Sequence, residues 1–180
     1  MKVFMQSIVS VFLFSFFISC DPASSKLKEL SDFIPKNPSV VLSINDFEAL
    51  KSDLKNNSFL TELKNSQPYS YLKNKEVFNL LNPSSKSILC ITEENDTSSF
   101  TFITKLNKGL FNLDSIPNKT IKNISFSSYT FQKVIINEQV VFTTIEDSIF
   151  IASNSQKVLE QIVSGNIEND AVFRKITALS

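Results

Sequence analysis

Residues 124–152 read ISFSSYTFQKVIINEQVVFTTIEDSIFIA, a series of short apolar runs separated by polar pairs. Several of these runs alternate apolar and polar residues, which is the period of a strand that buries one face. The polar pairs Asn137-Glu138 and Glu146-Asp147 have the length of two-residue hairpin turns. We therefore predict an antiparallel β-meander, in which successive strands pair through hairpins.

Working outward, the alternation already begins near Ser85 and is clear in Phe100, Phe102, Thr104 and Leu106. The regions on either side carry the 3.6-residue period of amphipathic helices. Predicted helices cover residues 25–33, 46–54, 59–81 with a break at Pro68, 155–163 with a stop at Gly165, and 171–179. Ser39 to Ile44 is predicted to be one further, buried strand. These elements indicate an α+β fold with the helices on one face of the sheet.

The start of the second helix carries a capping signal. Asn45 and Asp46 precede the helical pattern, and Glu48 follows Asn45 by three residues, the spacing of a capping box. Asn45 is therefore the predicted N-cap.

The first twenty residues have the organisation of a secretory signal peptide. Lys2 precedes an apolar stretch from Ile8 to Ile18, and small residues follow it. The stretch is too short for a transmembrane helix, which needs about 20 apolar residues. We predict a cleaved signal peptide at residues 1–19, a modified cysteine with its tether at 20–25, and an α+β domain at 26–180.

Phe17-Ile18-Ser19-Cys20 resembles the lipobox of bacterial lipoproteins, although Phe17 stands where that motif usually has Leu. The resemblance implies that the Cys20 thiol receives a diacylglycerol and that the protein contacts the membrane through this lipid. Two or three acyl chains are enough for durable anchoring, because each buried methylene contributes about 0.8 kcal/mol. The predicted location is the cell envelope, with the outer membrane favoured and the periplasmic and surface faces both left open.

Composition excludes several classes of activity. The chain has 18 basic and 18 acidic residues, no histidine and two glycines. Without histidine, Ser-His-Asp and Cys-His catalysis and imidazole zinc sites are excluded. No glycine-rich phosphate loop is present, and the dispersed lysines predict no nucleic-acid partner. We predict no catalytic, cofactor-binding or metal-binding residue, no cofactor, and a buried, unreactive Cys90.

Carboxylates are the remaining groups that could support catalysis. They cluster in two predicted turns, one with Glu93, Glu94 and Asp96 and one with Glu146 and Asp147. A glycosidase needs two carboxyl groups about 5–10 Å apart across a cleft. A carboxylate-dependent envelope hydrolase therefore requires that residues of these turns share one pocket.

Three segments resemble the uncharacterised exported lipoproteins of Bacteroidota, especially the flavobacterial type. The segments are Ser19 to Asp21, Phe33 to Val40 with Asn45 to Lys51 after it, and Glu146 to Leu159. Such proteins are usually several times longer, which implies that this chain is an N-terminal part of a longer protein and that its domain is incomplete. Asp114-Ser115-Ile116 and Asp147-Ser148-Ile149 resemble the O-glycosylation acceptor of that phylum, which makes Ser115 and Ser148 candidate sites.

These observations favour a lipid-anchored envelope protein without enzymatic activity, whose domain binds an envelope partner or acts as a scaffold. Two alternatives stay open. One is the carboxylate-dependent hydrolase. The other is a spacer domain whose associated activity lies beyond residue 180.

Overall fold

A seven-stranded antiparallel sheet forms the centre of the molecule. The computed structural model describes residues 28–56, 76–94, 97–114 and 116–165. Its elements are the 3-10 helix η2 (Leu30–Phe33), β1 (Val40–Ile44), α2 (Phe47–Asn56), α5 (Glu76–Leu80), β2 (Ser87–Glu94), β3 (Thr97–Lys105), β4 (Lys119–Phe126), β5 (Tyr129–Ile136), β6 (Gln139–Glu146), β7 (Ile149–Ser153) and α6 (Gln156–Val163). The predicted α+β class with an antiparallel sheet is confirmed.

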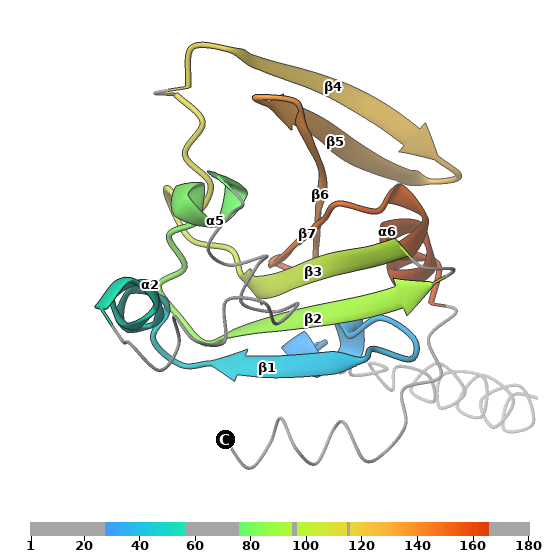
Figure 1. Cartoon of the computed structure of the whole chain (residues 1–180). Helices are drawn as coiled ribbons and strands as arrows, with labels where there is room; N and C mark the ends of the chain where they lie inside the picture. Colours follow the sequence, from blue (N-terminus) through green and yellow to red (C-terminus); the bar gives the residue numbers. More distant parts are fainter. Residues whose placement is uncertain (1–27, 57–75, 95–96, 115, 166–180) are drawn as a thin grey trace, which may run out of the picture.

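The strand order β1-β2-β3-β7-β6-β5-β4 differs from a single meander. Hairpins join β2 to β3, β4 to β5, β5 to β6 and β6 to β7, as the polar connectors predicted. However, β3 pairs with β7, and β4 lies at the far edge of the sheet (Figure 1). The prediction that all successive strands pair is therefore wrong at β3 and β4, because the longer connection between them lets the chain cross to the other edge.

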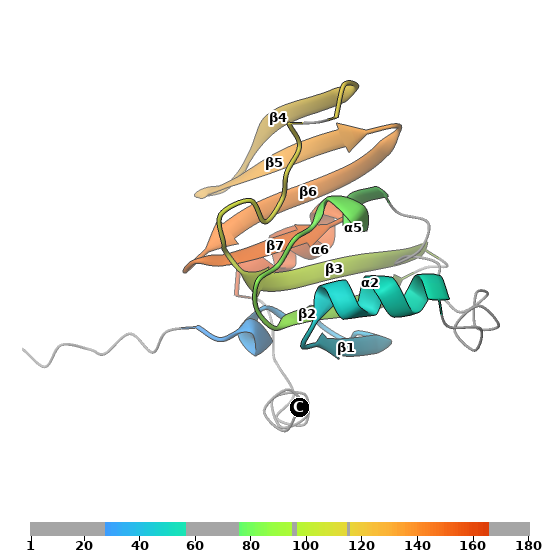
Figure 2. The same cartoon turned by 90° about the vertical axis from the view of Figure 1, so that its left-hand side faces the viewer.

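The prediction that helices cover one face is also wrong, because both faces carry helices. Side chains of α2 and α5 form a cluster with one face, which we call the α2 face. Side chains of η2 and α6 form a second cluster with the opposite face, the α6 face. Figure 2 shows α2 and α5 in front of the sheet and α6 behind it. An apolar helical stripe specifies that a helix packs, but it does not specify which face receives it.

Aromatic contacts fix α2 and α5 above the middle of the sheet. The ring centroid of Phe47 lies 5.3 Å from that of Phe102 on β3, in edge-to-face geometry. Phe78 of α5 lies 5.1 Å from Phe100 and 6.2 Å from Phe102. Such pairs add to the stabilisation that ring burial itself provides. These ring contacts are centred on β3. The described helices of this face therefore cover the β1–β3 side of the sheet and leave β4, β5 and β6 uncovered by a described helix.

The helix boundaries agree with the sequence in some places and differ in others. Ser155 caps α6 by accepting a hydrogen bond from the Val158 amide, and Gly165 follows with φ +71°, as predicted. Helix 25–33 is reduced to η2 in its described part. Of helix 59–81 the structure describes α5 and the residue that follows it. Helix 171–179, the signal peptide, Cys20 and the tether lie outside the described residues.

Candidate functional site

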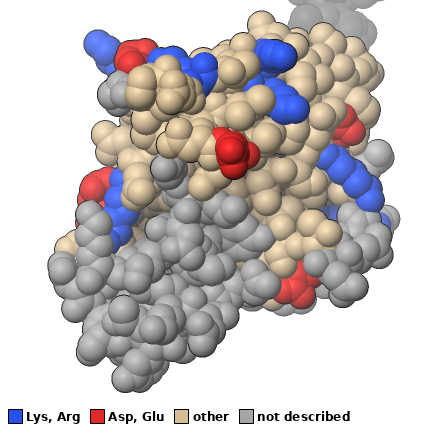
Figure 3. All heavy atoms as spheres, turned by 45° about the horizontal axis from the view of Figure 1, so that its top comes forward, with Lys and Arg blue, Asp and Glu red and all other residues tan. Residues whose placement is uncertain are grey.

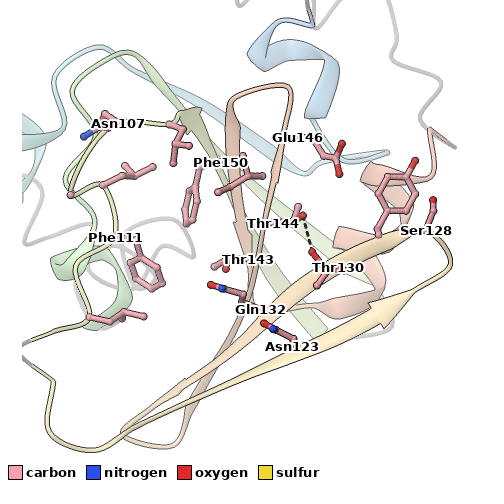
Figure 4. A pocket seen from close by; sticks show the side chains of 16 residues that line it. Asn107, Phe111, Asn123, Ser128, Thr130, Gln132, Thr143, Thr144, Glu146 and Phe150 are labelled. Atoms are coloured by element: carbon pink, nitrogen blue, oxygen red, sulfur yellow. Dashed lines mark hydrogen bonds between the residues drawn. The ribbon is translucent and has the colours of Figure 1, made fainter.

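A pocket of about 650 Å³ lies beside the helix-covered part of the α2 face. Its floor is formed by β4, β5, β6 and β7, and its wall is the connection from Leu106 to Leu113 that follows β3. Figure 4 shows Phe111, Phe150, Thr143 and Gln132 around a common space. The volume is within the range of about 300–1,000 Å³ that small-molecule sites usually have. The lining residues are Leu106, Asn107, Gly109, Leu110, Phe111, Leu113, Asn123, Ser128, Tyr129, Thr130, Gln132, Thr143, Thr144, Ile145, Glu146 and Phe150.

Three uncharged polar side chains form a row across the floor. Gln132 of β5 is paired with Asn123 of β4 on one side and with Thr143 of β6 on the other. Directly paired residues of adjacent strands lie on the same face, with Cβ atoms about 4.5–5.5 Å apart. Figure 4 shows the three side chains next to one another on adjacent strands. We call Asn123, Gln132 and Thr143 the polar row.

The polar row continues across the sheet as an apolar row. Thr143 pairs with Ala152, and the register then continues through Phe102, Leu89 and Leu42 to the opposite edge. The side chains are apolar where α2 and α5 cover the sheet and become polar in the pocket. The same face is therefore divided into a core region and a region that is open to a ligand.

The amide groups of the polar row are accessible. Asn123 and Gln132 are exposed, whereas Thr143 is buried at the inner end of the row. Among the residues that the structure describes, none has a hydrogen bond to the side chain of Asn123 or Gln132. Each amide thus retains both its donor and its acceptor for a bound molecule.

Apolar side chains line the pocket next to the polar row, both on the floor and on the wall. The rings of Phe111 and Phe150 are 5.8 Å apart at an interplanar angle of 53°. Leu106 and Ile145 also line the pocket, and their exposed fractions are 47% and 53%. A single large apolar residue at the surface is ordinary, but here the two belong to one concave site that also contains polar groups.

The 106–113 wall is held in place by its own hydrogen bonds. Asn107 accepts a hydrogen bond from the Ser84 amide through Oδ1 and donates one from Nδ2 to the Asn82 carbonyl. The Asn82 amide in turn donates to the Leu110 carbonyl at 2.7 Å. Next to them, Leu81 and Phe111 form an isolated antiparallel bridge. Because these bonds connect the wall to the segment after α5, the pocket is formed without a ligand.

Little charge is present in the pocket. Of the lining residues that the structure describes, Glu146 alone is charged, and it is partly buried. The neighbouring Asp147 points to a different partner, Lys28, whose Nζ lies 3.4 Å from Asp147 Oδ2. Figure 3 shows a mostly uncharged surface in which the coloured side chains are few and of both signs. Within residues 28–165, leaving out the gaps, no group of three metal-ligating side chains is found.

The two acidic turns are at opposite ends of the sheet. The first joins β2 to β3 next to Thr97, and the second joins β6 to β7 next to Ile149. Ile149 pairs with Lys105 at the far end of β3, so the turns are about 27 Å apart at the usual rise per strand residue. Glu93, the described carboxylate of the first turn, therefore lies far from Glu146 and Asp147, whereas the hydrolase alternative required a shared pocket. The side chain of Glu94 and all of Asp96 lie outside the described part.

The other predicted sites have different outcomes. Ser148 is exposed in the β6–β7 turn with φ +65°, whereas Ser115 and Cys20 are outside the described residues. Cys90 is fully buried on the α6 face, as predicted. Burial raises the pKa of the Cys90 thiol well above its usual range, which disfavours the reactive thiolate. Among the described residues, no helix has the length and hydropathy needed to cross a bilayer.

The polar row was not predicted from the sequence. Asn123, Gln132 and Thr143 occupy the polar positions of alternating strands, which ordinarily face water. The available signal was the hairpin register, because the two-residue turns at 127–128 and 137–138 place these three residues side by side. The sequence contained no comparable signal for the 106–113 wall, because the position of the wall depends on a contact between Phe111 and Phe150 of β7.

We compared the chain with profiles of protein families, with curated proteins and with solved structures, and found no significant match in any of the three comparisons. The functional argument therefore depends on the residues and geometry described above.

Proposed function

We propose that this chain is a lipid-anchored protein of the bacterial cell envelope, at the outer membrane, whose α+β domain binds a small molecule or part of an envelope partner without catalysing a reaction. The observation that carries the binding role is the pocket formed by the polar row and the 106–113 wall. It combines a rigid wall, accessible amides and an apolar side, which are the features of a recognition site.

The anchoring role is supported by the leader sequence. A single cation, a short apolar stretch and Ser19-Cys20 have the arrangement of a lipoprotein signal. Lys28, the first described residue, lies against the β6–β7 turn through Asp147. Seven residues separate Cys20 from Lys28, so a lipid on Cys20 keeps this end of the sheet within about 28 Å of the bilayer.

The non-catalytic role is supported by the placement of the acidic groups. Glycoside hydrolysis and metal-assisted hydrolysis need converging carboxylates, and the two acidic turns are on opposite ends of β3. Glu146 is the one carboxylate in the pocket. The Asn, Gln and Thr side chains that also line the pocket can form hydrogen bonds with a neutral molecule, but they are not acids or bases that would activate it for a reaction.

Replacement of Cys20 tests the anchor. Cys20→Ala should abolish metabolic labelling with palmitate and leave the unprocessed precursor, because the substitution removes the thiol that carries the lipid. Cys90→Ala is the matched control and should keep the label, since that thiol is buried. Palmitate labelling that persists in Cys20→Ala contradicts the anchoring role.

The binding role can be tested by measuring the Tm of the full chain in the presence of small polar molecules that are neutral, anionic or cationic. At least one class should raise Tm, because a ligand that binds only the native state stabilises it. Ile145→Arg places a cation at the pocket and should remove the shift. Ile121→Arg, on an Ile with similar exposure outside the pocket, should retain it. The absence of a shift with all classes, or an equal shift in both variants, contradicts binding at this pocket.

A further inference from the structure

We infer that the ligand of this pocket is a neutral saccharide, which specifies the chemical class that the proposed binding function leaves undefined. The inference depends on that function, since it concerns the same pocket. It is carried by three features: the chemistry of the polar row, the apolar side chains next to it, and the paired sheet backbone beneath Gln132 and Thr143.

The polar row matches hydroxyl groups. A side-chain amide carries two donors and an acceptor oxygen, and a threonine hydroxyl both donates and accepts. Sugar hydroxyls also donate and accept, so a saccharide can satisfy Asn123, Gln132 and Thr143 together. The strand spacing of about 4.7–4.9 Å separates successive members of the row by roughly the distance between hydroxyls on opposite sides of a pyranose ring.

The apolar side matches the other surface of a sugar ring. A pyranose presents C–H groups on its faces, and these groups are covered well by aromatic and aliphatic carbon. Phe150 and Ile145 on the floor and Phe111 and Leu106 on the wall provide such a surface next to the polar row. A ligand in the 650 Å³ space can therefore contact both hydrogen-bonding groups and carbon.

Charged ligands are disfavoured by the lining. Among the described residues, no Lys or Arg lines the pocket, so a phosphate, sulfate or uronate would find no cation there to balance its charge. Glu146 adds a negative charge at one end. The site therefore selects against acidic sugars as well as nucleotides.

An extended peptide that adds a strand is also disfavoured over the inner part of the polar row, because the backbone at Gln132 and Thr143 is already paired. Peptides that bind to sheets usually add a strand and pair with free backbone N–H and C=O groups. At Gln132 of β5 and Thr143 of β6, the backbone is paired with a strand on both sides. Over these two residues a ligand meets side chains, which favours a molecule that is rich in hydroxyls.

The inference can be tested by isothermal titration of the full chain with a defined panel. The panel contains neutral gluco-, manno-, xylo- and N-acetylglucosamine oligosaccharides, an oligogalacturonate, and a neutral tripeptide. At least one neutral oligosaccharide should bind, and the oligogalacturonate and the tripeptide should not. Saturation-transfer NMR of that complex should show transfer from the Phe111 and Phe150 rings to ring protons of the sugar.

Variants of the polar row locate the binding. Gln132→Ala should weaken the affinity about three- to tenfold, because one or two hydrogen bonds are lost. Asn123→Ala is a second variant with the same expectation, and both side chains are exposed, so the fold is retained. Thr120→Val, on an exposed residue of β4 outside the pocket, is the control and should leave the affinity unchanged.

The outcomes separate this inference from the proposed function. If none of the neutral oligosaccharides binds, or if Gln132→Ala and Asn123→Ala bind them as well as the native chain, the saccharide class is wrong. If the tripeptide or the oligogalacturonate binds, and Ile145→Arg abolishes that binding, the pocket function is retained and the assignment of a neutral saccharide is wrong. If no ligand of any class shows a response that depends on Ile145, both proposals are wrong.

Discussion

Asp46 shows how a single side chain defines the beginning of an element. Its Oδ1 accepts a hydrogen bond from the Ala49 amide at 2.8 Å, so Asp46 is the N-cap of α2. The sequence predicted Asn45 in that role, one residue earlier, because Glu48 completes a capping box with Asn45. The two residues have similar capping preference, so only the backbone geometry distinguishes them.

Substitution of the two candidates distinguishes them in solution. Asp46→Ala should lower the free energy of unfolding by about 1 kcal/mol, because an orphan amide of the first turn loses its acceptor. Asn45→Ala should change it by less than about 0.5 kcal/mol, as expected for an exposed residue outside such a bond. Equilibrium urea denaturation gives both values. A larger loss in Asn45→Ala than in Asp46→Ala would support the cap predicted from sequence.

Burial of Cys90 makes the stability of the native state depend on pH. In the unfolded chain its thiol has a pKa of about 8.5, and in the native state burial raises that pKa. Above pH 8.5 the unfolded state therefore releases a proton that the native state retains. The stabilisation is present at lower pH and decreases as the pH rises, by up to about 1.4 kcal/mol per pH unit.

Denaturation with urea at about pH 7 and about pH 9.5 tests this dependence. The native chain should lose more stability between the two values than Cys90→Val, which keeps an apolar side chain of similar size but has no thiol. Other groups titrate equally in both proteins, so the difference between them isolates Cys90. An identical loss in the two proteins would show that the thiol does not contribute.

The hairpin turns are formed largely without glycine. Asn137 and Glu138 in the β5–β6 turn have φ values of +44° and +70°, and Asp147 and Ser148 in the β6–β7 turn have +49° and +65°. Positive φ at both central residues is the geometry of type I′ turns, which match the twist of the strands. Asn tolerates this conformation best among non-glycine residues, whereas Glu138 is strained there.

Glu138→Gly should therefore raise the stability. The substitution creates Asn-Gly, the preferred type I′ pair. The free energy gained from relief of the backbone strain exceeds the entropic cost of ordering a glycine by about 0.5 kcal/mol. Glu138→Ala keeps a Cβ atom and should give no increase. Thermal denaturation of the three proteins measures the effect. A lower Tm for Glu138→Gly than for Glu138→Ala would contradict the argument.

Short sequence patterns predicted the pairing of strands that are joined by hairpins, but they did not predict the pairing of strands that are far apart in the chain. Polar pairs such as Asn137-Glu138 indicate a hairpin because both the turn and the register are contained in a few residues. The pairing of β3 with β7 joins residues 44 to 52 positions apart, such as Lys105 with Ile149 and Thr101 with Ser153. No alternation in either strand specifies that partner. The pocket was missed for the same reason, because Phe150 of β7 and Phe111 meet only after this pairing has formed.

The β3–β7 ladder joins the two halves of the molecule. One half is β1, β2 and β3, and the other is β4 to β7. At this junction Ser153 is fully buried, its Oγ donates to the Phe100 carbonyl at 2.6 Å, and it accepts from the Ser155 amide at 3.1 Å. Buried polar groups without a partner are costly, so Ser153 stabilises the junction and the start of α6 together.

Ser153→Ala should lower the free energy of unfolding by about 1–3 kcal/mol, because a buried carbonyl and amide lose their partner. Ser125→Ala, at an exposed position on β4, should change it by less than about 0.5 kcal/mol. Hydrogen exchange should show faster opening in β1–β3 and in β4–β7 of Ser153→Ala. Faster exchange confined to one half would mean that the halves unfold independently.

The position of β7 between β3 and β6 has a consequence for biogenesis. A chain that leaves a ribosome or a translocation channel from its N-terminus exposes β3 long before its final neighbour has been delivered. Until β7 emerges, the edge of β3 from Thr101 to Lys105, which contains Phe102 and Ile103, has no partner strand and can pair with other nascent molecules. We therefore expect that a holdase that shields β3 until β7 has emerged increases the yield of folded protein.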